Sequence, residues 1–310
     1  MGGSGGGGFF YESKPEEIAQ KIRNEEEKSQ NSVYETSITA LMRDLLSVVN
    51  DRDTDSIQRH LTTIEGAVHK DIEGYIDLRY AGSVAKHTYV DGLSDIDSIA
   101  ILNDCDLVNA TPNEVKKHFY DKLCERLPST DIRIGNLAVT IKFSSGIEIQ
   151  ILPAMKDETG IRIPSSRRSN EWSHIIKPDK FALALRYTNT HTSGKLVPVI
   201  KLAKSIIASF PESRKISGYH VESLAIEVFG QYTGEKKLKP MLKHFFSEAA
   251  KYVLAPIKDK TGQSVHVDDY LGETNSLIRK MVADSMSTVA RKMQNADGSR
   301  EIRIWEQFLK

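Results

Sequence analysis

The stretch that most constrains the fold is an acidic pair directly before an apolar run. Ser94-Asp95-Ile96-Asp97 leads into residues 99–102 (Ile-Ala-Ile-Leu), whose length and β-branched content predict a buried strand. Side chains two positions apart share a strand face, so Asp95 and Asp97 are expected side by side. Two such carboxylates repel each other unless a cation such as Mg²⁺, which prefers oxygen ligands, lies between them. The pattern predicts a metal site or, in a plainer interpretation, a solvated turn before an ordinary strand.

A small, flexible pair, Gly82-Ser83, lies about ten residues upstream of the acidic pair. Glycine lets the backbone approach a phosphate group closely, and backbone N–H groups and a hydroxyl are suitable donors. We therefore interpret Gly82 and Ser83 as candidate phosphate-binding residues.

Taken together, Gly-Ser, a spacer, Ser-Asp-x-Asp and an apolar strand resemble the signature of the DNA polymerase β-like nucleotidyltransferase superfamily. The resemblance implies an α+β fold, with a mixed sheet and helices in the nucleotidyltransferase core. It also implies that the Gly-Ser pair holds a nucleoside triphosphate and that the Asp pair binds two metal ions, Mg²⁺ or Mn²⁺.

Residues 147–153 (Ile-Glu-Ile-Gln-Ile-Leu-Pro) resemble the strand that carries a third carboxylate in this family. The family has Asp three residues before the proline, where this chain has Gln150. Glu148 is expected on the same face, so it could supply the carboxylate from one step back. Alternatively, Glu148 and Gln150 only line the solvated side of an edge strand.

The overall composition narrows the class of protein. Lysine plus arginine (42) balances aspartate plus glutamate (42), whereas a protein that binds long nucleic acid usually has a basic excess. No apolar run approaches the roughly 20 residues that span a membrane, and no signal-peptide pattern is present. Cys105 and Cys124 form no metal-type cluster, so neither zinc nor disulfides are expected. A cytoplasmic protein is the simplest interpretation.

Three segments are expected along the chain. Residues 1–12 form a flexible linker or tag, since the glycine-rich start cannot pack. Residues 13–168 form the nucleotidyltransferase core, with helices over 13–49 and 53–76 behind the sheet and a helix over 111–127. Residues 76–81 lead as a short strand or turn into Gly82, and strands over 131–143 and 146–152 are joined by a hairpin turn at 144–146. Residues 169–310 form a C-terminal helical lobe.

The helical lobe carries further candidate residues. Lys201 and Lys204 are three apart in an expected helix, so they share a face and could meet a triphosphate or simply be solvated. Ser217 is a suitable N-cap for the next helix. Tyr219 could stack on a nucleobase or anchor neighbouring helices.

These later segments extend the resemblance. Ser217-Gly-Tyr-His-x-Glu-Ser-Leu, Asp269-Tyr-Leu-Gly-x-x-Asn275-Ser, Trp305 and Phe308 resemble the CD-NTases, bacterial cyclic di- and oligonucleotide synthases related to cyclic GMP-AMP synthase and the 2′,5′-oligoadenylate synthetases. This resemblance implies that Lys204 contacts the triphosphate and that Tyr219 stacks on a base. It also implies NTP substrates, ATP among them, and a HORMA-domain protein as a plausible activator.

The expected function is metal-dependent synthesis of a cyclic di- or trinucleotide second messenger in bacterial anti-phage signalling. The expected site residues comprise Asp95, Asp97 and Glu148 for catalysis and metal binding, and Gly82, Ser83, Gln150, Lys204, Ser217 and Tyr219 for nucleotide binding. Two alternatives stay open: a nucleotidyltransferase acting on RNA, a small molecule or a protein, and a catalytically silent nucleotide-binding homologue.

Overall fold

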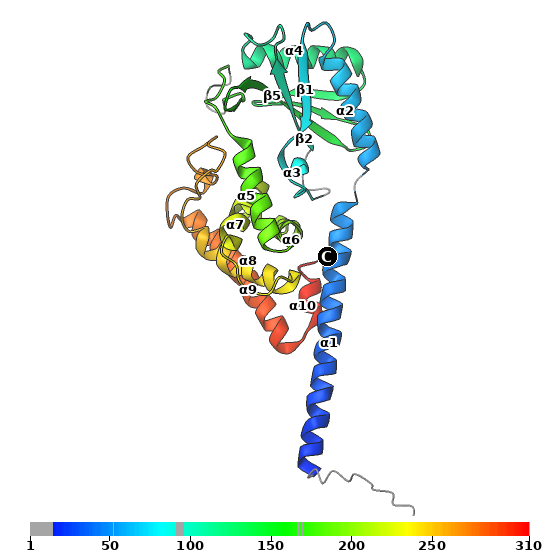
Figure 1. Cartoon of the computed structure of the whole chain (residues 1–310), viewed down its shortest axis with the longest axis vertical. Helices are drawn as coiled ribbons and strands as arrows, with labels where there is room; N and C mark the ends of the chain where they lie inside the picture. Colours follow the sequence, from blue (N-terminus) through cyan, green and yellow to red (C-terminus); the bar gives the residue numbers. More distant parts are fainter. Residues whose placement is uncertain (1–14, 52, 91–95, 166–167, 169, 310) are drawn as a thin grey trace, which may run out of the picture.

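The computed structural model describes residues 15–51, 53–90, 96–165, 168 and 170–309. Within them the chain has an α+β fold with a sheet lobe and a helical lobe (Figure 1). The elements of the sheet lobe are α2 (Thr54–Val68), β1 (Tyr75–Tyr80), α3 (Gly82–Ala85), β2 (Ile96–Asn103), α4 (Pro112–Arg126), β3 (Asp131–Ile134), β4 (Val139–Lys142), β5 (Glu148–Asp157) and β6 (Gly160–Arg162). The other elements are α1 (Pro15–Asn50), α5 (Pro178–His191), α6 (Leu196–Ala208), η1 (Glu212–Arg214), α7 (Gly218–Phe229), α8 (Leu238–Tyr252), η2 (Asp269–Leu271), α9 (Leu277–Ser299) and α10 (Ile302–Glu306).

The sheet is mixed, with the strand order β1-β2-β5-β4-β3 and with β6 paired to β5. β2 and β5 run parallel, and the other strand pairs are antiparallel. Alternate residues of β2, among them Ile96, Ala100 and Leu102, are buried in the core that α2 and α4 form with one face of the sheet. The intervening residues therefore lie on the opposite face, which turns toward the helical lobe.

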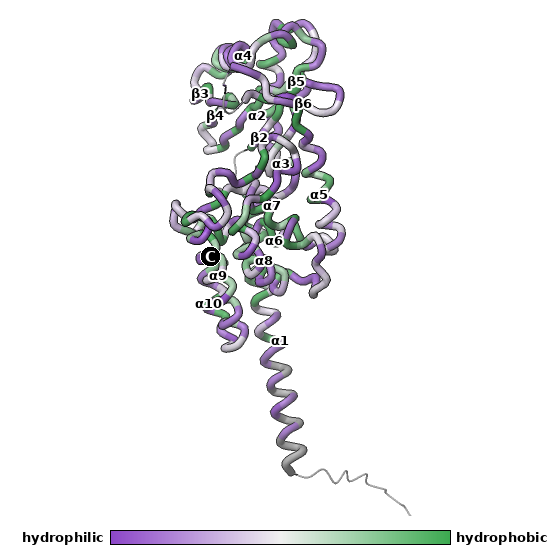
Figure 2. Tube along the Cα trace, turned by 90° about the vertical axis from the view of Figure 1, so that its left-hand side faces the viewer, coloured by the Kyte–Doolittle hydropathy of each residue, from purple (hydrophilic) through white to green (hydrophobic). Residues whose placement is uncertain are grey.

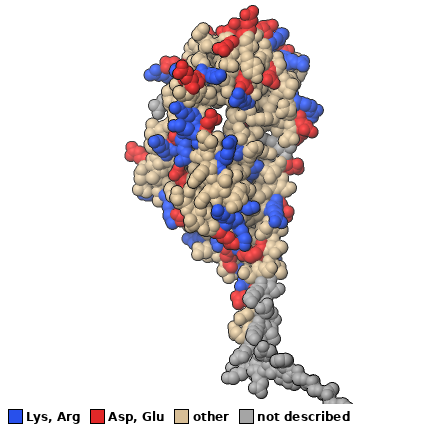
Figure 3. Space-filling model, in the orientation of Figure 1, with Lys and Arg blue, Asp and Glu red and all other residues tan. Residues whose placement is uncertain are grey.

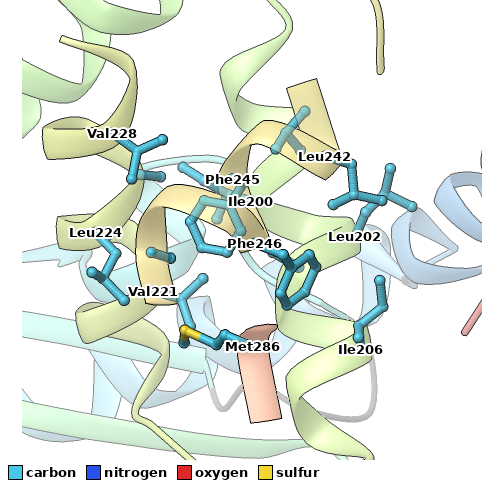
Figure 4. Packing of buried hydrophobic residues seen from close by; sticks show 14 of the residues in the cluster. Ile200, Leu202, Ile206, Val221, Leu224, Val228, Leu242, Phe245, Phe246 and Met286 are labelled. Atoms are coloured by element: carbon cyan, nitrogen blue, oxygen red, sulfur yellow. The ribbon is translucent and has the colours of Figure 1, made fainter. Parts of the chain in front are cut away.

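The helical lobe has its own hydrophobic core, built from α6, α7, α8 and α9 around Phe245 and Phe246 (Figure 4). Each fully buried large apolar side chain of this kind stabilises the fold by roughly 1.5–3 kcal/mol. α6 is apolar on most of its surface because it lies in the middle of this bundle. The lobe is thus a rigid support for the residues that α6 and α7 present to the sheet.

The expectation that both N-terminal helices cover the sheet is confirmed for α2 and wrong for α1. Tyr34, Ile38 and Met42 of α1 belong to the core of the helical lobe. The Tyr34 hydroxyl accepts a hydrogen bond from Trp305 Nε1 at 2.9 Å and lies 3.0 Å from the Ala296 carbonyl oxygen, to which it donates. α1 therefore runs along the helical lobe, and its first turns extend beyond the lobe in Figures 1 and 2.

Several predicted elements differ in their limits. The helix predicted to reach residue 76 ends at Val68, because Asp71 (φ 62°) and Gly74 (φ 110°) adopt backbone conformations that no helix can contain. β1 begins directly afterwards and leads to Gly82, as predicted. The predicted helix after Thr111 is confirmed as α4, with a capping box between Thr111 and Glu114.

The single strand predicted over 131–143 is wrong. It is two strands, β3 and β4, which pair antiparallel around a turn in which Gly135 N–H donates to the Ala138 carbonyl at 2.7 Å. The predicted hairpin at 144–146 is confirmed, and β5 continues past Pro153 to Asp157. No helix of the described ranges is both long enough and apolar enough to cross a membrane.

Candidate active site

The parallel pairing of β2 with β5 sets the geometry of the candidate catalytic residues. Asp97 is the direct partner of Gln150, and both lie on the sheet face opposite the α2–α4 core. Glu148 starts β5 two residues earlier on the same face, as its spacing predicts. Asp95, the other member of the acidic pair, lies outside the described residues.

Gly82 lies directly against Asp97. The Ala81 N–H donates to the Asp97 carbonyl at 2.8 Å, and the chain then turns at Gly82 with φ at 52°. A Cβ atom on Gly82 would be 1.8 Å from Oδ2 of Asp97, so only glycine fits here. The structure therefore brings the predicted phosphate-binding pair and one predicted acidic residue together.

A cleft of about 1140 Å³ separates the open face of the sheet from α5, α6 and α7. Five predicted site residues line it: Gly82, Ser83, Asp97, Lys204 and Tyr219. Glu148, Gln150 and Ser217 do not line it. Ser217 instead caps α7, since its Oγ accepts from the His220 N–H at 3.2 Å.

Cationic side chains also line the cleft. Lysine and arginine side chains gather where the two lobes meet on the face shown in Figure 3. Those that line the cleft, besides Lys204, are Arg79, Lys86, Lys156, Lys177 and Lys180. Acidic side chains line the cleft as well: Asp77, Asp97, Asp157, Glu158, Asp179 and Glu222. Individual cations such as Lys86 and Lys204, and not an overall positive charge, are therefore the groups that could meet a phosphate.

Lys204 is a buried ammonium group at the inner end of the cleft, only 7% exposed. Its Nζ donates to Oε1 of Glu222 at 2.8 Å and to the Thr88 carbonyl at 2.9 Å. Burial lowers the pKa of Lys204, and the charge of Glu222 opposes that effect. Lys201, one turn earlier, does not line the cleft; its Nζ donates to Asn50 and lies 4.3 Å from the centroid of the Tyr89 ring.

Tyr219 is half-buried in the wall of the cleft, and Nζ of Lys86 lies 5.2 Å from the centroid of its ring. Its ring centroid lies 4.7 Å from that of Phe181, and its hydroxyl donates to Asp259 at 2.8 Å. Burial raises the pKa of Tyr219, so the phenol stays protonated. The phenol and one side of the ring are thus fixed by the protein, and the ring borders the cleft.

Sequence reasoning missed Lys86 and Glu222 as site residues. Lys86 follows α3 and forms an ion pair with Glu222, while its Nζ lies 4.9 Å from the Phe181 ring centroid. Glu222 is the glutamate of the Ser217-Gly-Tyr-His-x-Glu-Ser-Leu motif, and Lys86 lies in the spacer after Gly82-Ser83. Their position within the family signatures was the available signal.

The donors around Asp97 suit a hard divalent cation. The carboxylate of Asp97 and the amide of Gln150 share one sheet face with Glu148, and Mg²⁺ takes oxygen ligands of this kind. Among the residues that the structure describes, no group of three His, Cys, Asp or Glu side chains could hold a metal by itself. The predicted metal ligands Asp95, Asp97 and Glu148 therefore stay a prediction, since Asp95 lies outside the described residues.

The family model described as the Second Messenger Oligonucleotide or Dinucleotide Synthetase domain matches residues 33–189. The chain belongs to this family. Members of the Second Messenger Oligonucleotide or Dinucleotide Synthetase family are CD-NTases, so the chain is a nucleotidyltransferase of the class that makes cyclic oligonucleotides. No curated protein sequence matches it.

Solved structures of CD-NTases share the fold of this family member. CdnC of E. coli MS115-1 with ATP has a TM-score of 0.68 at 16% identity, over 88% of this chain and 96% of that one. The STING-associated CdnE c-di-GMP synthase of Capnocytophaga granulosa has a TM-score of 0.59 at 18% identity, over 83% and 99%. CdnG of Bradyrhizobium diazoefficiens in complex with GTP has a TM-score of 0.62 at 14% identity, over 84% and 92%. These similarities support the assignment of the fold.

Proposed function

We propose that this chain is a metal-dependent synthase that joins nucleoside triphosphates, ATP among them, into a cyclic di- or trinucleotide second messenger. The observation that carries the proposal is the contact of Gly82 with Asp97 in a cleft lined by Lys86 and Lys204. The volume of about 1140 Å³ also exceeds the roughly 300–1,000 Å³ that is usual for a pocket with one small ligand. The cleft thus has room for a donor and an acceptor nucleotide.

The proposed reaction is an in-line displacement. A ribose hydroxyl oxygen of the acceptor attacks the α-phosphorus of the donor, the new P–O bond forms, and the bond to pyrophosphate breaks. A divalent cation held by Asp97 together with Asp95 and Glu148 would lower the pKa of that hydroxyl and neutralise charge on the pyrophosphate. A second displacement within the linear product closes the ring.

The chain's own residues have positioning and electrostatic roles in this proposal. Gly82 and Ser83 offer backbone N–H groups and a hydroxyl to the phosphates. Lys86 offers positive charge from the same wall of the cleft, and Lys204 of α6 offers it from the opposite wall. Tyr219 offers its aromatic ring to the base, and base–aromatic stacking is worth roughly 1–3 kcal/mol. Holding the reactants in line in this way supplies most of what a phosphoryl-transfer enzyme must do.

The biological setting is part of the proposal. The fold is shared with CdnC, which is also known in a CdnC:HORMA-deltaN complex, so we include a HORMA-domain protein as the activator of this chain. We place the enzyme in anti-phage signalling in the bacterial cytoplasm, where NTPs are abundant. Product formation by the purified chain alone at a rate comparable to that with a HORMA protein would exclude an obligate activator.

One observation favours a second candidate, a silent nucleotide-binding homologue. Gln150 is the direct strand partner of Asp97, where the family resemblance leads us to expect a carboxylate. Gln150 can offer an oxygen but no negative charge, and Glu148 does not line the cleft. NTP binding without any pyrophosphate release would support this alternative.

Release of pyrophosphate tests the proposed function. Each of the four NTPs, alone and in pairs, is incubated with the chain and Mg²⁺ or Mn²⁺, without any added acceptor. The proposal expects metal-dependent release that is lost in the Asp97→Asn variant. Release that requires added RNA, protein or a small molecule would instead identify another kind of nucleotidyltransferase.

A further inference from the structure

Glu222 of α7 is a carboxylate buried between the two lobes, with 1% of its surface exposed. Its Oε1 accepts hydrogen bonds from Lys204 Nζ at 2.8 Å and from the Thr88 hydroxyl at 2.5 Å. Its Oε2 accepts from Lys86 Nζ. Three donors therefore converge on one side chain, which a buried carboxylate requires if it is to stay charged.

The donors come from both sides of the cleft. Lys86 and Thr88 belong to the segment that follows α3 in the sheet lobe, and Lys204 belongs to α6 in the helical lobe. The Thr88 N–H donates to the Ser83 carbonyl at 2.9 Å, so this segment is folded back onto the Gly-Ser pair. Glu222 thus connects the predicted phosphate-binding pair to the helix that carries Tyr219.

The cluster has a net positive charge that faces the cleft. Lys86 and Lys204 carry two positive charges against one negative charge, and all three residues line the cleft. Burial alone would raise the pKa of Glu222, but the two lysines outweigh burial and lower it, so the carboxylate is ionised. Gly218 leaves room for this arrangement, because a Cβ atom there would lie 3.3 Å from Nζ of Lys204.

We propose that Glu222 is a positioning residue that sets the ammonium groups of Lys86 and Lys204 for the triphosphate of a bound NTP and holds the Gly82-Ser83 segment against the helical lobe. The proposal rests on the proposed function, since it presumes that a triphosphate binds in this cleft. Glu222 itself does not touch the nucleotide. It acts through the two lysines, each of which keeps donor capacity for phosphate oxygens.

The test compares three variants with the wild type. Glu222→Gln keeps the shape and removes the charge; Glu222→Asp keeps the charge with a shorter reach. Glu227→Gln is the matched control, because Glu227 lies on the same helix, does not line the cleft and forms a partly exposed ion pair with Lys260 at 2.6 Å. For each chain the measurements are binding of ATP, GTP, CTP and UTP, the KM and kcat of pyrophosphate release, and the melting temperature.

We expect Glu222→Gln to raise the KM and the dissociation constant of the preferred NTP at least tenfold, with a smaller change in kcat. Glu222→Asp should have an NTP affinity between those of Glu222→Gln and the wild type. It still tests the proposal if Glu222→Gln fails to fold. Glu227→Gln should bind and react as the wild type does. If KM rises in Glu222→Gln and lies closer to the wild-type value in Glu222→Asp, Glu222 positions the lysines. A general loss of stability would not give this pattern.

Two results would overturn the proposal. One is unchanged NTP binding and KM in folded Glu222→Gln or Glu222→Asp, which would make the cluster purely structural. The other is tighter NTP binding by Glu222→Gln, which would mean that Glu222 competes with phosphate for the lysines. If the wild-type chain binds no NTP, the proposed function fails together with this inference, whereas normal wild-type binding isolates the failure to Glu222.

Discussion

The backbone of Gly82 and the carboxylate of Asp97 are in such close contact that a methyl group on Gly82 would lie 1.8 Å from Oδ2. Gly82→Ala must therefore displace the carboxylate, and the φ of 52° adds roughly 1–2 kcal/mol of strain. Since a misplacement of about 1 Å can cost about 100-fold in rate, we expect kcat to fall by about that factor. Pyrophosphate release measures it.

Gly66→Ala is the control for that substitution. Gly66 lies within α2, and a Cβ atom there would meet nothing within 4 Å. We expect unchanged activity and a melting temperature that stays or rises, because alanine favours a helix by about 1 kcal/mol over glycine. Full activity of Gly82→Ala would show that the position of Asp97 does not matter.

The third ligand position gives the second prediction. Gln150→Asp places a carboxylate directly beside Asp97 in the strand pairing, so activity should stay or rise. Glu148→Gln should reduce turnover strongly, with partial recovery in Mn²⁺, which accepts mixed ligands more readily. The initial rates of both variants in Mg²⁺ and Mn²⁺ test this. A silent Glu148→Gln, together with activity that exists only in Gln150→Asp, would identify the natural chain as a pseudoenzyme.

Two lysines one turn apart on α6 give a matched comparison. Lys204→Ala removes an ammonium group at the cleft, and we expect NTP affinity to fall at least tenfold, since a hydrogen bond to a charged group contributes roughly 1.5–3 kcal/mol. Lys201→Ala removes a cation–π contact with Tyr89 outside the cleft, so NTP affinity should stay near the wild-type value. The NTP affinity of both variants is measured by titration at a temperature at which both are folded. An equal loss of affinity in the two variants would argue against a phosphate contact by Lys204.

Stability should depend on pH through His220. Burial lowers the pKa of His220 from 6.5 to about 4, against the raising effect of Asp268, whose Oδ2 lies 3.5 Å from Nε2. The unfolded chain binds a proton below pH 6.5 that the folded chain does not, so the free energy of unfolding falls as the pH drops from 6.5 toward 4. The full loss is about 3 kcal/mol, at ~1.4 kcal/mol per pKa unit. Urea unfolding at pH 7 and pH 5 measures the first part of this loss, about 2 kcal/mol.

His220→Gln is the control for the pH dependence. It removes the titrating ring while keeping a polar group beside the Tyr270 hydroxyl, which lies 3.0 Å from Nδ1 of His220. The variant is less stable at pH 7, but its stability should change less between pH 7 and pH 5. Parallel losses in the variant and the wild type would assign the acid sensitivity to other groups.

Elements that are marked by a few neighbouring residues could be predicted from the sequence. The β-branched content of its sequence predicts β2, and the capping residues at Thr111 predict the start of α4. The turn residues at 144–146 predict the hairpin between β4 and β5. The turn between β3 and β4 was missed although the sequence marks it twice. The apolar alternation shifts by one residue between Ile134 and Leu137, and the turn residues Gly135-Asn136 lie at that point.

Long-range packing was harder to predict. The amphipathic pattern around Tyr34 shows that α1 has a buried side but not which lobe covers it. Likewise, sequence spacing relates Lys204 to Lys201 but not to Glu222, 18 residues away, nor to Lys86 in the other lobe. The placement of Gly82 and Ser83 beside Asp97 was accessible only because the family signature groups them. The domain boundary at 168 and the role of Asp95 remain predictions.

Mass spectrometry of the reaction products shows whether this cleft makes a cyclic oligonucleotide. The chain is incubated with all four NTPs and Mg²⁺ or Mn²⁺, without an acceptor, beside the variant in which Asp95 and Asp97 are both Asn. We predict that the wild type forms a product that lacks terminal phosphates and has the mass of a cyclic di- or trinucleotide, and that the variant forms none while remaining folded. Wild-type turnover by the double variant, or only linear products from the wild type, would contradict the account.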